Sequence, residues 1–309
     1  MYCAPSNNST LQNSCFTENQ ILKICKSYNS TCDKKSRINT ANRNINSMYK
    51  ELKSKLNNID EYLWIENNKN TKFLSDDEIQ GIFVPKMPNE WCKNIQIWRN
   101  QTNNNNINAP WLSNFDIDKV IKQYYNKYHN FIYLGTYPID FQQYNIFGCV
   151  SNLCGFNIDN ILSKNKNCFG LVLNTDKHTQ SGTHWISIFC NIRTRTFYFF
   201  NSANNKKNNI PPEVIKFAKD VEQQVFKLYN KKLEFKFNNN VIHQSSNSEC
   251  GIYSIYFILS LLDADENNNN GREIFEKYFN NPQFKLQDSK MLKQRFKYYR
   301  PNNKCSINK

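Results

Sequence analysis

Residues 184–201 read HWISIFCNIRTRTFYFFN, and this stretch decides the fold of the region around it. Apolar residues stand at every second position from 186 to 192, which is the spacing of a strand with one buried face. Aromatic and β-branched residues fill Thr196–Phe200, a composition typical of a second strand. Because only the polar segment 191–195 separates the two, we predict a β-hairpin.

Two polar side chains lie at the open end of this hairpin. His184 begins the first strand and Asn201 ends the second. The start of one strand of a hairpin lies beside the end of the other, so the two side chains should meet. The carboxamide oxygen of Asn201 would accept a hydrogen bond from one ring nitrogen of His184 and leave the other free. This is the orienting arrangement of a cysteine–histidine–asparagine triad, although Asn201 alone could be a simple turn residue.

The chain has four histidines, and two of them, His178 and His243, are alternatives to His184 as the general base. His178 lies in a polar stretch that reads as a loop. His243 directly precedes Gln244, and we expect its ring to face solvent. We therefore assign the base to His184.

A long apolar segment begins at Cys250 and continues to Leu262. It is apolar on nearly all sides, which predicts a buried helix. The first amides of a helix have no intrahelical partners and the dipole is positive there, so a thiolate at Cys250 would be stabilised as a nucleophile. Gly251 would leave room for a substrate backbone. The alternative is a buried structural cysteine.

Gln244 lies six residues before Cys250, and the segment between them is polar. We expect residues 245–249 to form an exposed loop that arches over the start of the helix. The Gln244 amide and the Cys250 backbone N–H would then make a two-donor oxyanion hole, although Gln244 could also be a plain loop residue. Trp185 would cover this site and limit the access of water.

The flanking sequence predicts an α+β domain in which helices pack on a sheet. Two prolines at 211 and 212 suit the first turn of a helix, and apolar residues with helical spacing continue to 228. Residues up to about 125 read as mainly helical and irregular. We therefore predict a helical N-terminal domain at 1–125 and a catalytic domain at 126–309. The other expected strands are 131–134, 168–173 and 233–237, and the other expected helices are 273–279 and 290–298.

Composition narrows the partners and cofactors. The chain has 309 residues, a net charge of +14 and 11 cysteines. There is no Cys-x-x-Cys pair and no zinc-finger spacing, so we expect no metal, no cofactor and free thiols in a reducing compartment. No apolar run is long enough to span a bilayer, and residues 1–10 lack the features of a secretion signal. Asparagine runs at 103–106, 238–240 and 267–270 predict surface loops.

The ordered set His184, Asn201, Gln244 and Cys250 resembles the clan that contains the SUMO-specific proteases and the adenovirus protease. Together with the stretches 176–178, 182–185, 198–203 and 243–251, it is most similar to polyprotein-processing cysteine proteases of the African swine fever virus type.

The resemblance implies a papain-like core with a mixed sheet and a helical N-terminal arm domain. It also implies cleavage of viral capsid or core polyproteins after Gly-Gly-Xaa sites during virion maturation. The substrate glycines would pass through a narrow tunnel, with Trp185 as one wall. We accordingly expect a monomer that acts in the host cytoplasm, at the viral factory, and in the virion.

Two other functions stay open. A protease for SUMO or ubiquitin-like modifiers is the first, and Asn201 counts against it because SUMO proteases mostly have Asp there. The second is an inactive basic scaffold that binds nucleic acid, as the net charge of +14 allows.

Overall fold

The computed structural model describes all residues except 1, 6, 8, 10, 12, 42, 43, 58, 93, 94, 96–99, 101–106, 268, 269 and 303–309. Two compact units emerge from the contacts within the chain. The first comprises Met1–Cys92 with Lys297–Lys309, and the second, which we call the catalytic unit, comprises Lys93–Phe296. This division differs from the predicted 1–125 and 126–309. The helix α7 (Asn114–Lys122) packs on the strand β1 (Phe131–Pro138), which draws it into the catalytic unit.

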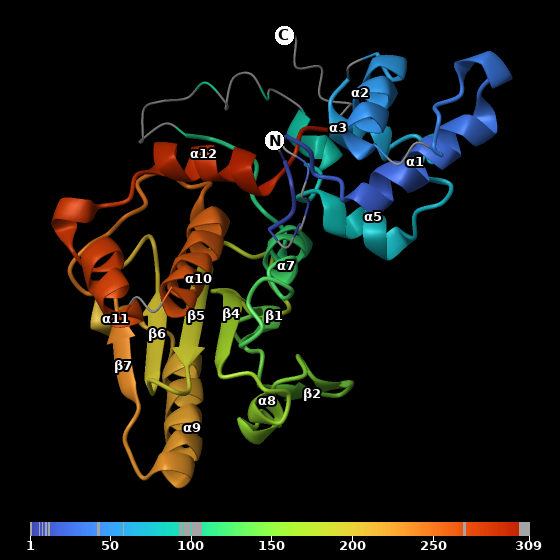
Figure 1. Ribbon diagram of the computed structural model, residues 1–309. Helices are drawn as coiled ribbons and strands as arrows, with labels where there is room; N and C mark the ends of the chain where they lie inside the picture. The colour runs from blue at the N-terminus through green and yellow to red at the C-terminus, as the bar shows by residue number, and fades with distance from the viewer. Residues whose placement is uncertain are drawn as a thin grey trace. The chain divides into compact units, whose positions relative to one another are not determined.

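A five-stranded mixed sheet forms the centre of the catalytic unit (Figure 1). Its strand order is β1-β4-β5-β6-β7. The two outer pairs, β1 with β4 and β6 with β7, are parallel, and the two inner pairs are antiparallel. The strands other than β1 are β4 (Cys168–Asn174), β5 (Trp185–Asn191), β6 (Thr196–Phe200) and β7 (Glu234–Phe237). The mixed α+β sheet that we predicted is therefore present.

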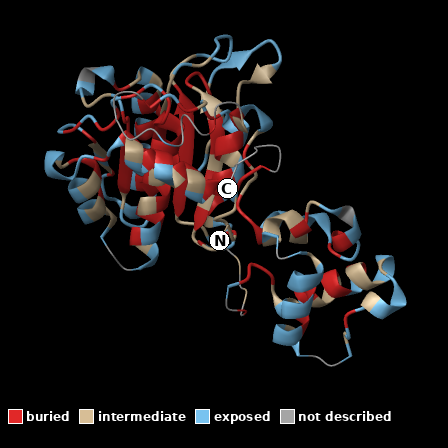
Figure 2. Ribbon diagram, turned by 90° about the horizontal axis from the view of Figure 1, so that it is seen from above, coloured by how far each residue is buried: buried red, intermediate tan, exposed pale blue. Residues whose placement is uncertain are grey.

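Helices cover both faces of this sheet, and for that reason its central strands are buried on both sides. On one face, α9 (Pro212–Tyr229) joins the alternate residues of β4, β5 and β6 in one apolar core. On the other face lies α10 (Cys250–Glu266), whose Phe257 ring stacks on Phe200 of β6 with ring centroids 4.9 Å apart. Figure 2 shows the resulting band of buried residues through the sheet.

The predicted hairpin is confirmed. Strands β5 and β6 pair in antiparallel register from Ser187 opposite Phe200 to Asn191 opposite Thr196. The chain reverses at Arg195, which has a φ of 56°. This register brings the residue that follows β6 back to the beginning of β5, where the candidate site lies.

Several elements of the catalytic unit follow from tertiary packing rather than from periodicity. A short ribbon interrupts the path from β1 to β4, and the C-terminal helical region is more broken than we predicted. These elements are β2 (Tyr144–Asn145), β3 (Gly148–Cys149), α8 (Asp159–Leu162), the 3-10 turns Lys207–Asn209 and Pro282–Phe284, α11 (Gly271–Ile274), a π-helical turn (Phe275–Phe279) and α12 (Asp288–Tyr298).

The N-terminal unit has its own small core. Trp64 is fully buried and its ring stacks on Phe16, with centroids 5.5 Å apart. The C-terminal segment belongs to this unit because Arg300 pairs with Glu66 at 2.7 Å. Its helices are α1 (Glu18–Thr31), α2 (Ile45–Lys55), α3 (Glu61–Trp64), α4 (Asn68–Thr71) and α5 (Asp76–Ile82), with 3-10 turns at Lys34–Ser36 and Asn89–Cys92.

The cysteines correct one expectation. Free thiols were predicted, but Cys3 is bonded to Cys15 and Cys149 to Cys154. Local chain reversals bring each pair together, with Cα atoms 5.1 Å and 6.1 Å apart, which is within disulfide reach. Cys92 is also disulfide-bonded. The free cysteines of the described residues are Cys25, Cys32, Cys168, Cys190 and Cys250.

The asparagine runs have different outcomes. Residues 103–106, and 268 and 269 of the third run, lie outside the described residues. Asn238, by contrast, is buried rather than in a surface loop. Among the described residues, no group of His, Cys, Asp and Glu could hold a metal ion, and no helix is long and apolar enough to cross a membrane.

Candidate active site

Cys250 is the first residue of α10, as predicted. The backbone amides of Trp185 and Gly251 act on its thiol and favour the thiolate form. Trp185 directly follows His184 in the chain. The start of α10 therefore lies near the beginning of β5, which His184 directly precedes.

The protonation state of this thiol differs from our expectation. Burial raises the pKa of Cys250 to about 11, although the Trp185 and Gly251 amides act in the opposite direction. The side chain is only 2% exposed, so loss of hydration outweighs the favourable amides of the helix start. Cys250 is consequently a neutral thiol at neutral pH and needs a base to become a nucleophile.

His184 and Asn201 meet at the open end of the hairpin. Nε2 of His184 lies 2.9 Å from Oδ1 of Asn201, and the same Oδ1 accepts from the Ala203 amide at 3.0 Å. A backbone N–H can only donate, so this atom is the carboxamide oxygen, and the Nε2 that faces it must carry a proton. Burial lowers the pKa of His184, partly opposed by the Asn201 hydrogen bond. The ring is therefore neutral at neutral pH and Nδ1 can accept a proton.

A buried asparagine that we had placed in a surface loop holds Asn201. Asn238 is 1% exposed, and its Oδ1 accepts from the Asn201 amide at 3.0 Å. Its Nδ2 donates to the Asn201 carbonyl at 2.9 Å. These two bonds continue the pairing of β6 beyond its last residue, so the backbone that carries Asn201 is fixed.

The carboxamide of Gln244 is held at both ends. Its Oε1 accepts from the Ser202 hydroxyl at 2.7 Å, and its Nε2 donates to the Ser246 carbonyl, also at 2.7 Å. A carboxamide nitrogen carries two hydrogens, so one N–H remains for a ligand. The oxyanion role of Gln244 stays a prediction, but its orientation is defined.

The segment between Gln244 and Cys250 is only in part the exposed loop that we predicted, since Ser245 and Asn247 are exposed. Ser246, Ser248 and Glu249 are buried. The buried carboxylate of Asp288 makes this burial tolerable, since its Oδ2 accepts from the Ser246 amide at 2.7 Å. A residue 42 positions away in the chain thus supplies the hydrogen-bond partner that the local sequence lacks.

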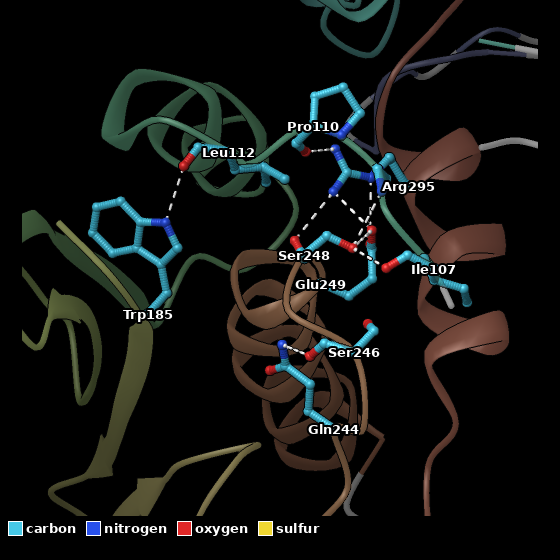
Figure 3. A network of polar contacts seen from close by, with 10 residues as sticks. Ile107, Pro110, Leu112, Trp185, Gln244, Ser246, Ser248, Glu249 and Arg295 are labelled. Carbon is cyan, nitrogen blue, oxygen red and sulfur yellow. Dashed lines mark hydrogen bonds and ion pairs between the residues drawn. The ribbon is translucent and has the colours of Figure 1, made fainter. Parts of the chain in front are cut away.

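A fully buried ion pair includes Glu249, the residue directly before Cys250 (Figure 3). Nη2 of Arg295 lies 2.9 Å from Oε1 of Glu249, and both side chains are 0% exposed. Arg295 also donates to the Pro110 carbonyl at 2.7 Å. Because the two charges compensate each other, the pair can stay buried away from solvent. It links α12, the start of α10 and the segment before α7.

Trp185 is anchored beside the site. Its indole Nε1 donates to the Leu112 carbonyl at 2.9 Å. A Cβ at Gly251 would lie 3.1 Å from Leu112 Cβ and 3.3 Å from Trp185 Cδ1. We predicted that Gly251 leaves room for a substrate backbone, but Leu112 and Trp185 fill that space. Glycine at 251 therefore allows the indole to approach the helix start.

An open cavity of about 450 Å³ adjoins Trp185. Trp111 also lines it and is 48% exposed, which is a large apolar surface for solvent to cover. Trp111 is one of three tryptophans, with Trp91 and Trp98, that stand near prolines in the sequence, and nothing in the local pattern distinguishes it; Trp98 lies outside the described residues. The remaining wall comes from the end of β1, the end of β4 and the loop 176–182.

The two rival histidines have other environments. His178 lies on the wall of that cavity, with Nδ1 2.6 Å from Oδ2 of the buried Asp140. His243 is fully buried, not solvent-facing as we expected. Its Nδ1 accepts from the Leu286 amide at 3.0 Å and its Nε2 lies 2.9 Å from the Phe279 carbonyl, so both ring nitrogens are occupied. Within the described part of the chain no hydrogen bond joins Cys250 to any of the three histidines, so the position of His184 next to Trp185 is what distinguishes it.

Comparison with known proteins shows what this chain is similar to. The profile of the Ulp1 protease family, C-terminal catalytic domain, matches residues 161–303. A protein of Acanthamoeba polyphaga mimivirus that is named a thiol protease is 26% identical over 271 residues, covering 85% of each chain. The cysteine protease of African swine fever virus is 32% identical over 166 residues, which cover 50% of this chain and 59% of that protein.

The fold agrees with this relationship. The crystal structure of the African swine fever virus protease superposes with a TM-score of 0.60, covering 98% of this chain and 96% of that one, at 22% identity. That likeness extends over the Ulp1-like core and the helical N-terminal region. Residues 161–303 thus match the catalytic domain of the Ulp1 protease family, and together with the viral relatives this match supports a cysteine peptidase.

Proposed function

We propose that this chain is a viral maturation endopeptidase in which Cys250 is the nucleophile and His184 the base, with Asn201 as the residue that orients the base. The observation that carries the assignment is the meeting of three elements at one point. The Trp185 indole lies against the start of α10, where a Cβ at Gly251 would be 3.3 Å from its Cδ1, and the neighbouring His184 ring is held by Asn201 at 2.9 Å.

The protonation states define the first chemical step. Because the thiol and the imidazole are both neutral, Nδ1 of His184 takes the thiol proton as the sulfur attacks the peptide carbonyl. The carbonyl oxygen becomes an oxyanion, which the Cys250 amide and the remaining N–H of Gln244 would stabilise. The imidazolium then gives its proton to the leaving amine. Water hydrolyses the thioester, with His184 again acting as base.

The cavity beside Trp185 supports a substrate with glycines at the cleavage site. Trp111 and Trp185 line the same cavity, and the Leu112 carbonyl fixes the Trp185 indole. A chain that passes between large rings toward a buried thiol has little room for side chains, which favours Gly-Gly-Xaa sequences. We extend the proposal to viral structural polyproteins as substrates, and to the viral factory and the virion as the places of action.

The experiment that tests this function compares Cys250→Ala with Cys32→Ala, a free cysteine outside the catalytic unit. We expect cleavage of a Gly-Gly-Xaa peptide to fall by a factor on the order of 10⁴ or more in Cys250→Ala, since the nucleophile is lost. Cys32→Ala should retain normal cleavage, and circular dichroism should be the same for both. Persistent cleavage by folded Cys250→Ala would exclude the assignment.

A modifier-specific protease is the second candidate. It is favoured by the African swine fever virus relative that is named a SUMO-1 cysteine protease. Reactive probes built on SUMO and ubiquitin C-termini, offered beside a Gly-Gly-Xaa peptide probe, distinguish the two substrate classes. Labelling by the short peptide alone supports the polyprotein substrate, whereas labelling by the modifier alone supports deconjugation. If no probe reacts and DNA binding weakens steeply with salt, the inactive scaffold is favoured instead.

A further inference from the structure

We propose that Ser202 is a positioning residue that sets the Gln244 carboxamide for oxyanion stabilisation. The inference rests on the proposed function, because it gives Gln244 its role in the reaction. Ser202 itself is 1% exposed and directly follows Asn201, so one dipeptide supports both the base and the oxyanion donor.

Three hydrogen bonds connect Ser202 with the Gln244 segment. Its hydroxyl donates to Gln244 Oε1 at 2.7 Å. Its backbone carbonyl accepts from the His243 amide at 2.9 Å and from the Gln244 amide at 2.8 Å. The backbone bonds fix where the Gln244 side chain begins, and the hydroxyl fixes where it ends.

The Ser246 carbonyl settles the orientation of the amide. A carbonyl oxygen can only accept, so the Gln244 atom 2.7 Å from it must be the nitrogen Nε2. The other carboxamide atom is then the oxygen, and Ser202 must be the donor to it. If the carboxamide rotated by half a turn, its oxygen would face the Ser246 carbonyl and its nitrogen the Ser202 hydroxyl. Ser202 and Ser246 together favour the orientation that leaves one N–H of Nε2 available.

This arrangement predicts what the Ser202 hydroxyl contributes. Without it, Gln244 Oε1 loses its donor and the carboxamide can rotate away from the reacting carbonyl. The loss should appear in the chemical step, since only the oxyanion uses the remaining N–H. Substrate binding before that step should be little changed.

A double-mutant cycle on the full chain tests the proposal. We expect kcat to fall by about 10²-fold in Gln244→Ala and by about 10-fold in Ser202→Ala, with KM nearly constant. The double variant should be no slower than Gln244→Ala alone, because Ser202 acts only through Gln244. Multiplied losses in the double variant would overturn the inference.

Two controls separate this effect from misfolding and from failure of the proposed function. Ser187→Ala removes a buried hydroxyl that has no hydrogen-bond partner within the described part of the chain, and we expect normal kcat. Alkylation of Cys250 by iodoacetamide forms no oxyanion, so its rate should be equal in Ser202→Ala and the unmodified chain. An unchanged kcat in Gln244→Ala would remove the oxyanion role itself. A normal effect of Gln244→Ala with no effect of Ser202→Ala would overturn only the positioning role.

Discussion

Two histidine pairs lie near the start of β5, and their comparison shows what makes a base. The His178–Asp140 contact is the shorter one, at 2.6 Å, and it includes a buried carboxylate. The His184–Asn201 contact is 2.9 Å and pairs the ring with a neutral amide. The second pair lies beside the proposed nucleophile, because Trp185, which directly follows His184, packs against Gly251 at the start of α10. Location relative to the sulfur, rather than strength of the partner, therefore identifies the base.

Removing the imidazole ring of each pair should give the largest difference in kcat/KM between them. His184→Ala should lower kcat/KM by about 10³-fold, since the variant lacks the proposed general base for the thiol proton. His178→Ala should cost less than about 10-fold, because that ring lines the cavity but does not reach the thiol. Steady-state cleavage of a Gly-Gly-Xaa peptide measures both. A larger loss in His178→Ala would reverse the assignment.

The pH dependence sharpens the same comparison. The pKa of His184 is lowered below 6.5 by burial, so the base stays neutral, and active, until the pH falls below that value. We expect kcat/KM to be level between about pH 7 and 9 and to fall about tenfold per unit below the midpoint, which should lie under 6.5. The thiol, with a pKa of about 11, should cause no further change of kcat/KM between pH 7 and 9. A bell-shaped pH profile of kcat/KM centred near neutral pH would indicate a thiolate–imidazolium pair instead.

Folding must be followed in the same titration. Burial lowers the pKa of His243 to about 4, below its ordinary value of 6.5, so the folded state holds the neutral ring. That contribution to stability is complete above pH 6.5 and is lost as the pH falls from there toward 4. Circular dichroism at each pH separates this destabilisation from protonation of His184.

The smallest expected losses of kcat come from changing the hydrogen-bond partners of the two histidine rings. Asn201→Ala removes one orienting hydrogen bond and should lower kcat about 10-fold, if the bond contributes about 1.4 kcal/mol to the transition state. Asp140→Asn keeps the shape of the other partner and should change kcat by less than about threefold. Parallel kinetics of the two variants check this order. Equal losses would mean that both pairs support the reaction.

The sequence predicted the parts of the site that depend on local pattern. Alternating apolar residues gave the hairpin that joins His184 to Asn201, and the apolar run gave a helix that begins at Cys250. It could not predict contacts between distant segments. The burial of Ser246 and Glu249 depends on Asp288 and Arg295. The anchoring of Asn201 depends on Asn238. Burial also changed the chemistry, since it outweighs the helix-start amides at the Cys250 thiol.

The most direct test of the account is to map which cysteine an electrophilic Gly-Gly peptide probe modifies. The free cysteines of the described chain offer four competitors, of which Cys32 is the most accessible and Cys25, Cys168 and Cys190 are buried. Mass spectrometry of the labelled protein should find the probe on Cys250, with labelling lost in His184→Ala and retained in His178→Ala. A probe found on another cysteine, or labelling of Cys250 that depends on His178 rather than His184, would contradict the account.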